Sequence, residues 1–304
     1  MKKTLIVPLI FILLISCSTG SSKENSTKLH VITTTGMLYD AVLNIVGDKM
    51  TCEAIMGPGV DPHLYKATQG DLTKLRNGQL IVYNGIFLEG KMSDILKELG
   101  KRKPTLAAAE SIPDSLLLSS VNHKDSFDPH VWFDVKRWQY VVSAIGNAVV
   151  SLDTENAKYY GENMSKYLVK LDSMDKYVRD RLSELSSTQR VLVTAHDAFG
   201  YFGDAYEIRV EALQGISTVS DFGLKDIANL IDLIIDNQIK AIFVETSVSE
   251  KSINAVIKGC QEKGHDVKIG GSLYSDAMGE LGTEEGTYIG MFKKNVDTIV
   301  DALK

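Results

Sequence analysis

The tripeptide Asp-Pro-His occurs twice in this 304-residue chain, at Asp61-Pro62-His63 and at Asp128-Pro129-His130. The chain holds only six His and six Pro, so a chance repetition of this kind would be rare. Proline fixes its own φ near −65° and holds the preceding residue extended, which makes each tripeptide a stiff corner. The Asp side chain can cap backbone N–H groups of the corner. Two stiff corners that each aim an imidazole suit a metal site, although a single one would more often be only a turn.

Two further candidate ligands lie in the second half of the chain. His196 ends the apolar run "RVLVTAH", and Asp276 follows the run "DVKIGG". Either residue could instead cap a helix. Ligands of open α/β sheets bind at the carboxyl ends of strands, so both residues occupy suitable positions. Three imidazoles and one carboxylate would form a cage for a divalent first-row cation.

Supporting residues are expected around such a cage. Glu245 in "IFVET" also ends a predicted strand, and we expect it to orient a ligand His rather than to bind the metal. Asp61 and Asp128 are expected to support the ligands of their own corners in the same way. The remaining histidines lack such a context and are interpreted as surface or structural residues: His30, His123 and His265.

Short apolar runs alternate with amphipathic segments in both halves of the chain. The runs are "LHVITTT", "CEAIM", "LIVYNG" and "PTLAAA" in the first half, and "RVLVTAH", "EIRVEAL", "KAIFVET" and "DVKIGG" in the second. This alternation predicts an α/β fold with two lobes, each a mainly parallel four-stranded sheet flanked by helices. The runs are continuously apolar, as expected for strands covered on both faces.

One long helix is predicted between the lobes, from Asp153 to Leu185. Apolar residues follow one another there at spacings of three or four, and the segment contains no Pro. A helix of this length would extend roughly 50 Å. A coiled-coil dimer is the alternative, but it would need a longer repeat with paired charges. The expected domains are therefore a first lobe at 29–152, a linking helix at 153–186 and a second lobe at 187–304.

The N-terminus has the features of a lipoprotein signal. Two Lys precede an apolar run that is too short to span a bilayer, so residues 1–16 are predicted to be a signal peptide. The run closes with "LISC", which predicts lipidation of Cys17, although an ordinary secretory signal is the alternative. Residues 17–28 then form a polar, flexible tether. We expect a membrane-anchored protein of the cell envelope, facing the periplasm or the exterior.

The composition is typical of a globular protein and gives little sign of a nucleic-acid partner. The formal net charge is −6 and the sequence pI is about 5.6, with 44% hydrophobic residues. Cys52 and Cys260 remain after removal of the signal, and both are interpreted as buried free thiols. A disulfide between them stays possible from sequence alone.

Several segments resemble one family of proteins over essentially the whole mature chain. These are "MGPGVDPHLYKATQGDL", "FDPHVWFDVKRW", "VLVTAHDAFGYF", "LQGIST" and "IGGSLYSDAMG". They resemble the cluster A-I substrate-binding lipoproteins of zinc and manganese ABC importers. The resemblance implies two lobes joined by a long backbone helix, with Zn²⁺ and/or Mn²⁺ held between them as the transported ligand. It places the family's ligands at His63, His130, His196 and Asp276, and implies an ABC permease and its ATPase as partners.

Two departures from the family pattern concern the choice of metal. Some manganese-binding relatives have Glu where this chain has His196, and many zinc-specific relatives carry a long His-rich loop where this chain has only "NGIFLEGKMSD". Three imidazoles and a carboxylate favour Zn²⁺ over Mn²⁺ by the Irving–Williams order. A bidentate Asp276 would admit Mn²⁺ at a higher coordination number.

The affinity of the site for either metal should fall as the pH drops through roughly 6.5, where a free His is protonated.

Two other functions were weighed against metal capture. A zinc hydrolase would use a similar ligand set, but it needs an open coordination position and a general base, and the chain has no HExxH motif. An adhesin-type surface lipoprotein is the other alternative, and it would leave the four ligands unexplained. We expect a monomeric binding protein and not an enzyme.

Overall fold

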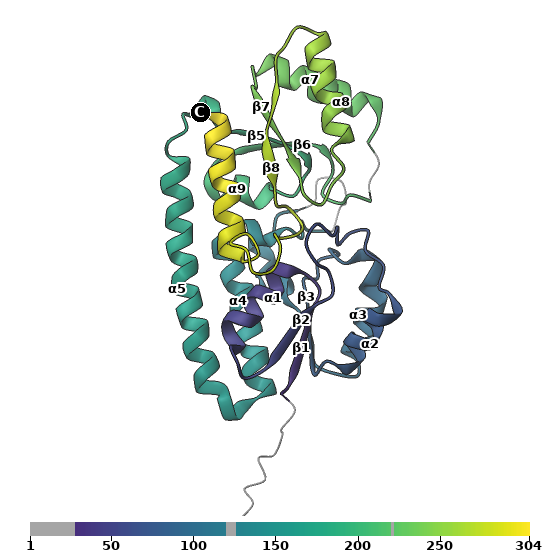
Figure 1. Ribbon diagram of the computed structural model, residues 1–304, viewed down its shortest axis with the longest axis vertical. Coiled ribbons are helices and arrows are strands. Elements are labelled where there is room, and N and C mark those ends of the chain that lie inside the picture. The colour runs from purple at the N-terminus through teal and green to yellow at the C-terminus, as the bar shows by residue number, and fades with distance from the viewer. Residues whose placement is uncertain (1–27, 120–125, 220–221) are drawn as a thin grey trace, which may run out of the picture.

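A computed structural model describes residues 28–119, 126–219 and 222–304. The predicted signal peptide, Cys17, nearly all of the tether and His123 lie outside these residues. Figure 1 shows the first lobe below, the second lobe above, and helix α5 running alongside both. Within the described ranges, no helix has both the length and the apolar character needed to cross a membrane.

The first lobe is built on one parallel four-stranded sheet, as predicted. Its order is β2-β1-β3-β4, and alternate residues of each strand face opposite layers of helices. Val31 and Val82 face α1 and α4, whereas Ile32 and Ile81 face α2 and α3. The elements are β1 (His30–Thr33), α1 (Gly36–Val46), β2 (Thr51–Ala54), α2 (Gln69–Asn77), β3 (Leu80–Tyr83), α3 (Ser93–Gly100), β4 (Thr105–Ala107) and α4 (Val135–Leu152).

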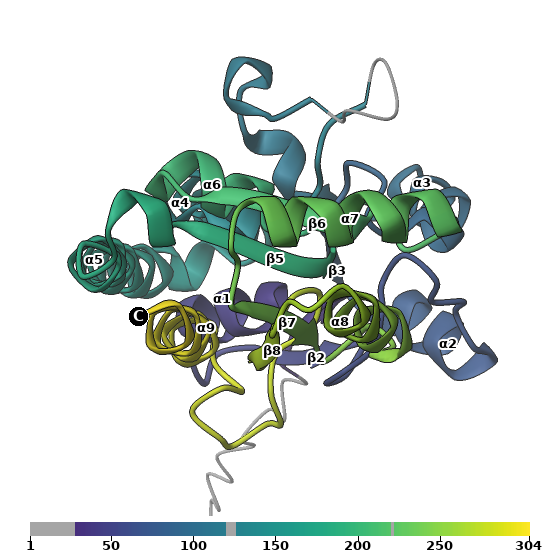
Figure 2. The ribbon, with the colours of Figure 1, turned by 90° about the horizontal axis from the view of Figure 1, so that it is seen from above.

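The second lobe contains the four predicted strands in two hydrogen-bonded parallel pairs, β5-β6 and β7-β8, instead of one continuous ladder. Figure 2 shows them in the order β6, β5, β7, β8, with α7 and α8 on one side and α9 on the other. At the carboxyl end of β5, the N–H of His196 donates to the side chain of Glu245, which ends β7, and not to a backbone carbonyl of that strand (2.8 Å). The elements are β5 (Val191–His196), α6 (Gly200–Tyr206), β6 (Arg209–Gln214), α7 (Leu224–Asp236), β7 (Ala241–Glu245), α8 (Lys251–Glu262), β8 (Lys268–Leu273) and α9 (Tyr288–Leu303).

The predicted linking helix is α5 (Ala157–Leu182), an unbroken helix of 26 residues. It begins four residues later than the sequence indicated, because Asp153 ends α4 and turns the chain. The Asp153 carboxylate accepts hydrogen bonds from the Asn156 side chain (2.8 Å) and the Tyr160 hydroxyl (2.6 Å). Short 3₁₀ turns connect several elements: Gly90–Met92, Ala108–Ser111, Asp114–Leu116, Val131–Phe133, Thr154–Asn156 and Ser187–Gln189.

The two cysteines are free thiols, as interpreted. Cys260 is fully buried in α8, but Cys52 is only partly buried. The difference follows from the topology, because Cys52 lies on β2, which is the edge strand of the first-lobe sheet.

The lobes share one hydrophobic core in addition to the linking helix. A single cluster of buried side chains runs from α1 and α4 through α5 to α6 and α9. Near its centre, the Tyr288 hydroxyl of α9 donates to the Trp132 carbonyl (2.7 Å), and the Trp132 indole donates to the Ser275 carbonyl (3.0 Å). Trp138 of α4 stacks on Tyr288 with ring centroids 5.3 Å apart. The second lobe is therefore packed onto the first, and a wide hinge motion would have to open this core.

We predict that metal loading leaves the overall dimensions nearly unchanged, because both α5 and the shared core oppose rotation of the lobes. Small-angle X-ray scattering of metal-free and Zn²⁺-loaded protein measures this directly, and the two curves should superimpose. A marked fall in the radius of gyration on loading would contradict the rigid arrangement.

Candidate metal centre

The structure brings the four candidate ligands into one cluster between the lobes. His63, His130, His196 and Asp276 are all buried, and one potential ligand atom of each lies within 4.8 Å of the others. The first two come from loops of the first lobe, and the other two follow β5 and β8 of the second. All three imidazoles direct Nε2 toward the Asp276 carboxylate.

The spacing of these atoms fits a small cation. His63 Nε2 lies 3.3 Å from His130 Nε2 and 3.7 Å from Asp276 Oδ2. His130 Nε2 lies 3.3 Å from Asp276 Oδ1, and His196 Nε2 lies 3.3 Å from Asp276 Oδ2. Ligands at about 2.0–2.1 Å from a tetrahedral Zn²⁺ are about 3.3–3.4 Å apart. Within the described part of the chain, His196 Nε2 and both Asp276 oxygens are buried without a hydrogen-bond partner, as expected of atoms that await a metal.

Each Asp-Pro-His corner is held by its own Asp, in two different ways. The Asp61 carboxylate accepts from the backbone N–H of His63 (2.8 Å) and of Leu64 (3.3 Å). Asp128 accepts from the backbone N–H of His130 (2.9 Å) and also lies 2.6 Å from the ring Nδ1 of His130. Asp61 therefore fixes a backbone turn, whereas Asp128 also fixes the orientation of an imidazole.

Glu245 holds the second-lobe histidine from the end of β7. One of its oxygens lies 2.5 Å from His196 Nδ1, and the other accepts the His196 backbone N–H. The close contact between Nδ1 and the Glu245 carboxylate leaves Nε2 directed at the cluster, which is the usual arrangement behind a metal-bound His. Both oxygens of Glu245 are thus engaged by the residue that it orients.

Charges in the cluster are strongly coupled. Burial lowers the pKa of His63 to about 3, so this ring is neutral. Burial also opposes protonation of His130 and His196, but the carboxylates beside them outweigh it. Asp128 and Asp276 raise the pKa of His130 to about 9, and Glu245 and Asp276 raise the pKa of His196 well above its usual value. Burial would raise the pKa of Asp276, but His196 and His130 hold it well below the usual range.

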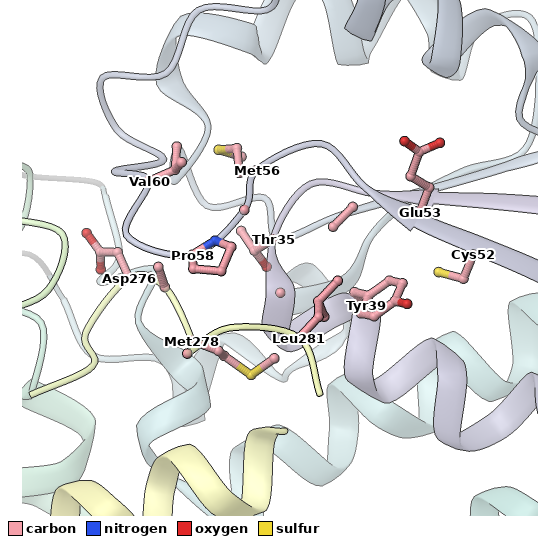
Figure 3. A pocket seen from close by; sticks show the side chains of 15 residues that line it. Thr35, Tyr39, Cys52, Glu53, Met56, Pro58, Val60, Asp276, Met278 and Leu281 are labelled. Carbon is pink, nitrogen blue, oxygen red and sulfur yellow. The ribbon is translucent and has the colours of Figure 1, made fainter. Parts of the chain in front are cut away.

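A cavity of about 260 Å³ lies beside the cluster, between the first lobe and the loop that carries Asp276 (Figure 3). Apolar side chains form most of its wall, among them Tyr39, Met56, Pro58 and Met278. Asp276 lies at its edge, with its carboxylate directed away from the cavity (Figure 3). The ligand-bearing loop is therefore less tightly packed on this side than toward the histidines.

His30 and His265, the other histidines that the structure describes, lie apart from the cluster, as interpreted. His30 Nδ1 lies 2.7 Å from the Thr51 hydroxyl near the surface, and His265 Nε2 lies 2.7 Å from the Ile239 carbonyl. Sequence reasoning did not identify Thr218, whose hydroxyl donates to Asp61 Oδ2 across the lobes (2.6 Å). Thr218 ends the segment "LQGIST", which carried the family resemblance without an assigned role.

Known proteins resemble the chain over nearly its whole length. Manganese-binding lipoprotein MntA of Bacillus subtilis is 49% identical over 292 residues, covering 96% of this chain and 95% of the relative. Zinc-binding protein TroA of Treponema pallidum is 46% identical over 273 residues, covering 90% and 88% respectively. The solved structure of periplasmic TroA matches with a TM-score of 0.89 and covers 91% of this chain and 99% of that one.

A family comparison agrees with these individual matches. Residues 31–302 match the family described as ZnuA, zinc-uptake complex component A periplasmic. This range includes all four clustered residues and both Asp-Pro-His corners. The chain belongs to this family of periplasmic metal-uptake proteins.

Proposed function

We propose that the protein captures Zn²⁺ and/or Mn²⁺ outside the cytoplasm and delivers it to an ABC permease and its ATPase. The ligands are His63, His130, His196 and Asp276, with Asp61, Asp128 and Glu245 supporting them. One observation carries the proposal: three imidazoles and a carboxylate converge in a buried cluster, and His196 Nε2 and both Asp276 oxygens have no hydrogen-bond partner among the described residues. Two ligands belong to each lobe under the expected division of the chain, in which the lobes are residues 29–152 and 187–304 and the linking helix is 153–186.

The ligand set favours Zn²⁺ but also accommodates Mn²⁺. Nitrogen-rich tetrahedral sites bind Zn²⁺ more tightly than Mn²⁺. Both oxygens of Asp276 face imidazoles, Oδ1 toward His130 and Oδ2 toward His63 and His196. A carboxylate in this position can supply a second oxygen, which is the harder ligand that Mn²⁺ prefers.

The geometry favours transport over hydrolysis. Four protein ligands close a tetrahedral site, whereas a catalytic zinc keeps one position for water. Glu245 would be the nearest candidate base, but both of its oxygens already bond His196. We therefore propose a monomeric binding protein without enzymatic activity, and a Zn²⁺-loaded sample should not turn over chromogenic esters or peptides.

We predict that Zn²⁺ or Mn²⁺ raises the melting temperature, because a ligand that binds only the folded state stabilises it by about 2.7 kcal/mol at 100 times its dissociation constant. Alanine at His63, His130, His196 or Asp276 should sharply reduce this rise, as measured by differential scanning calorimetry with and without metal. The matched controls His30→Ala and His265→Ala remove an imidazole elsewhere and should keep the rise. Wild-type affinity in both His63→Ala and His130→Ala would contradict the ligand assignment.

We also predict that binding releases about two protons per Zn²⁺ at neutral pH, because the raised pKa values leave His130 and His196 protonated without metal. His63 is already neutral and should contribute none. Protons therefore compete with Zn²⁺ for the imidazoles from about pH 9 downward, rather than from the pH of 6.5 expected for free imidazoles. The dissociation constant should therefore rise more steeply, as the pH falls below neutrality, than it would if only one imidazole had to lose a proton. Calorimetry in buffers of different ionisation enthalpy counts the protons, and a count near zero would contradict this charge state.

Anchoring is proposed to depend on lipidated Cys17. Cys17→Ala should move the protein from the membrane fraction to the soluble fraction of its native host, since a signal peptide without a lipidation site leaves no acyl anchor. Immunoblots of separated fractions measure the shift, with Cys52→Ala as the control that stays with the membrane. Equal membrane retention of the Cys17 variant would argue for a different attachment.

A further inference from the structure

A hydrogen bond links the two lobes beside the proposed metal ligands without involving any of them. The Thr218 hydroxyl, in the loop after β6, donates to Asp61 Oδ2 of the first lobe at 2.6 Å. The two residues are 157 positions apart in the chain. Because the acceptor is a carboxylate, this bond is of the stronger, charge-assisted kind.

Both ends of this bond are fastened to segments that carry ligands. On the first-lobe side, Asp61 Oδ1 accepts from the backbone N–H groups of His63 and Leu64, so one carboxylate holds both the corner and Thr218. On the second-lobe side, the Gln214 side chain donates to the Thr218 carbonyl (2.7 Å). Gln214 ends β6, where it pairs with His196 of β5. The bond therefore connects the turn that aims His63 to the strand end that aims His196.

We propose, resting on the metal-capture function above, that the Asp61–Thr218 bond is an interlobe latch that slows escape of the metal. A bound ion is enclosed by ligands from both lobes, so it leaves only after the His63 corner and the second-lobe loops separate. Thr218 touches none of the four ligand side chains in the contacts of the described residues, so it is a positioning residue that acts through Asp61. The latch must break when the metal is delivered to the transporter.

The test is the rate of Zn²⁺ transfer from the loaded full-length mature protein to an excess of chelator, followed by stopped-flow absorbance. Thr218→Val keeps the shape of the side chain but removes the donor. We expect its release rate to rise about tenfold, which corresponds to about 1.4 kcal/mol. The association rate should change little, because the ligands keep their positions. Thr218→Ser restores a hydroxyl and should release slowly, like wild type.

Two controls separate the latch from general damage. Ser217→Ala removes the neighbouring hydroxyl, which accepts only the Val219 N–H in the described contacts, and should keep the wild-type rate. The absorption spectrum of Co²⁺-substituted Thr218→Val should match that of wild type, which shows an intact ligand set. A wild-type release rate in Thr218→Val, or rapid release from Thr218→Ser, would overturn the latch.

A measurement on the metal-free protein tests the latch independently of whether the protein captures metal. In hydrogen–deuterium exchange of the metal-free protein, Thr218→Val should speed exchange of the His63 and Leu64 amides that Asp61 caps, because Asp61 loses its partner. Unchanged exchange would overturn the latch even in a protein that binds Zn²⁺ normally. Failure of the wild type to retain Zn²⁺ would instead refute the proposed function, and the exchange result would still decide the latch.

Discussion

The arrangement of the site depends on the groups that offset the buried negative charge of Asp276. The Asp276 side chain has no solvent exposure, and a charge in such a place costs several kcal/mol unless partners offset it. The partners are His130 and His196, each of which carries a further carboxylate behind its ring. Asp128, His130, Asp276, His196 and Glu245 thus form a row in which carboxylates and imidazoles alternate.

This row links the two lobes at the site. Its members come from both lobes, so separating the lobes would leave buried charges without partners. His63 stands outside the row as a neutral ring close to the same carboxylate. Under the proposed function, the metal replaces protons in this row, within a frame fixed by α5 and the shared core.

The sequence predicted the parts of the site whose causes are local. Proline and Asp set the corners of His63 and His130, and the ends of apolar runs located His196 and Glu245. It could not predict contacts between distant segments, such as Thr218 with Asp61 or Trp132 with Ser275, because their spacing reflects packing of whole lobes. For the same reason the sequence did not predict that Asp276, from across the lobe interface, joins Asp128 in raising the pKa of the buried His130. The later start of α5 also follows from a particular side chain, Asp153, which turns the chain after α4.

The position of α9 in the shared core has a consequence for the order of folding. Tyr288 and its neighbours on α9 complete a core that otherwise belongs largely to the first lobe and α5. Because α9 follows all the strands of the second lobe in the sequence, this part of the first-lobe packing is complete only when α9 docks against it. Contacts between such distant parts of a sequence form slowly, since a long loop must close first. The first lobe therefore depends on a helix far from it in the sequence for part of its packing, which raises the mean sequence separation of its contacts.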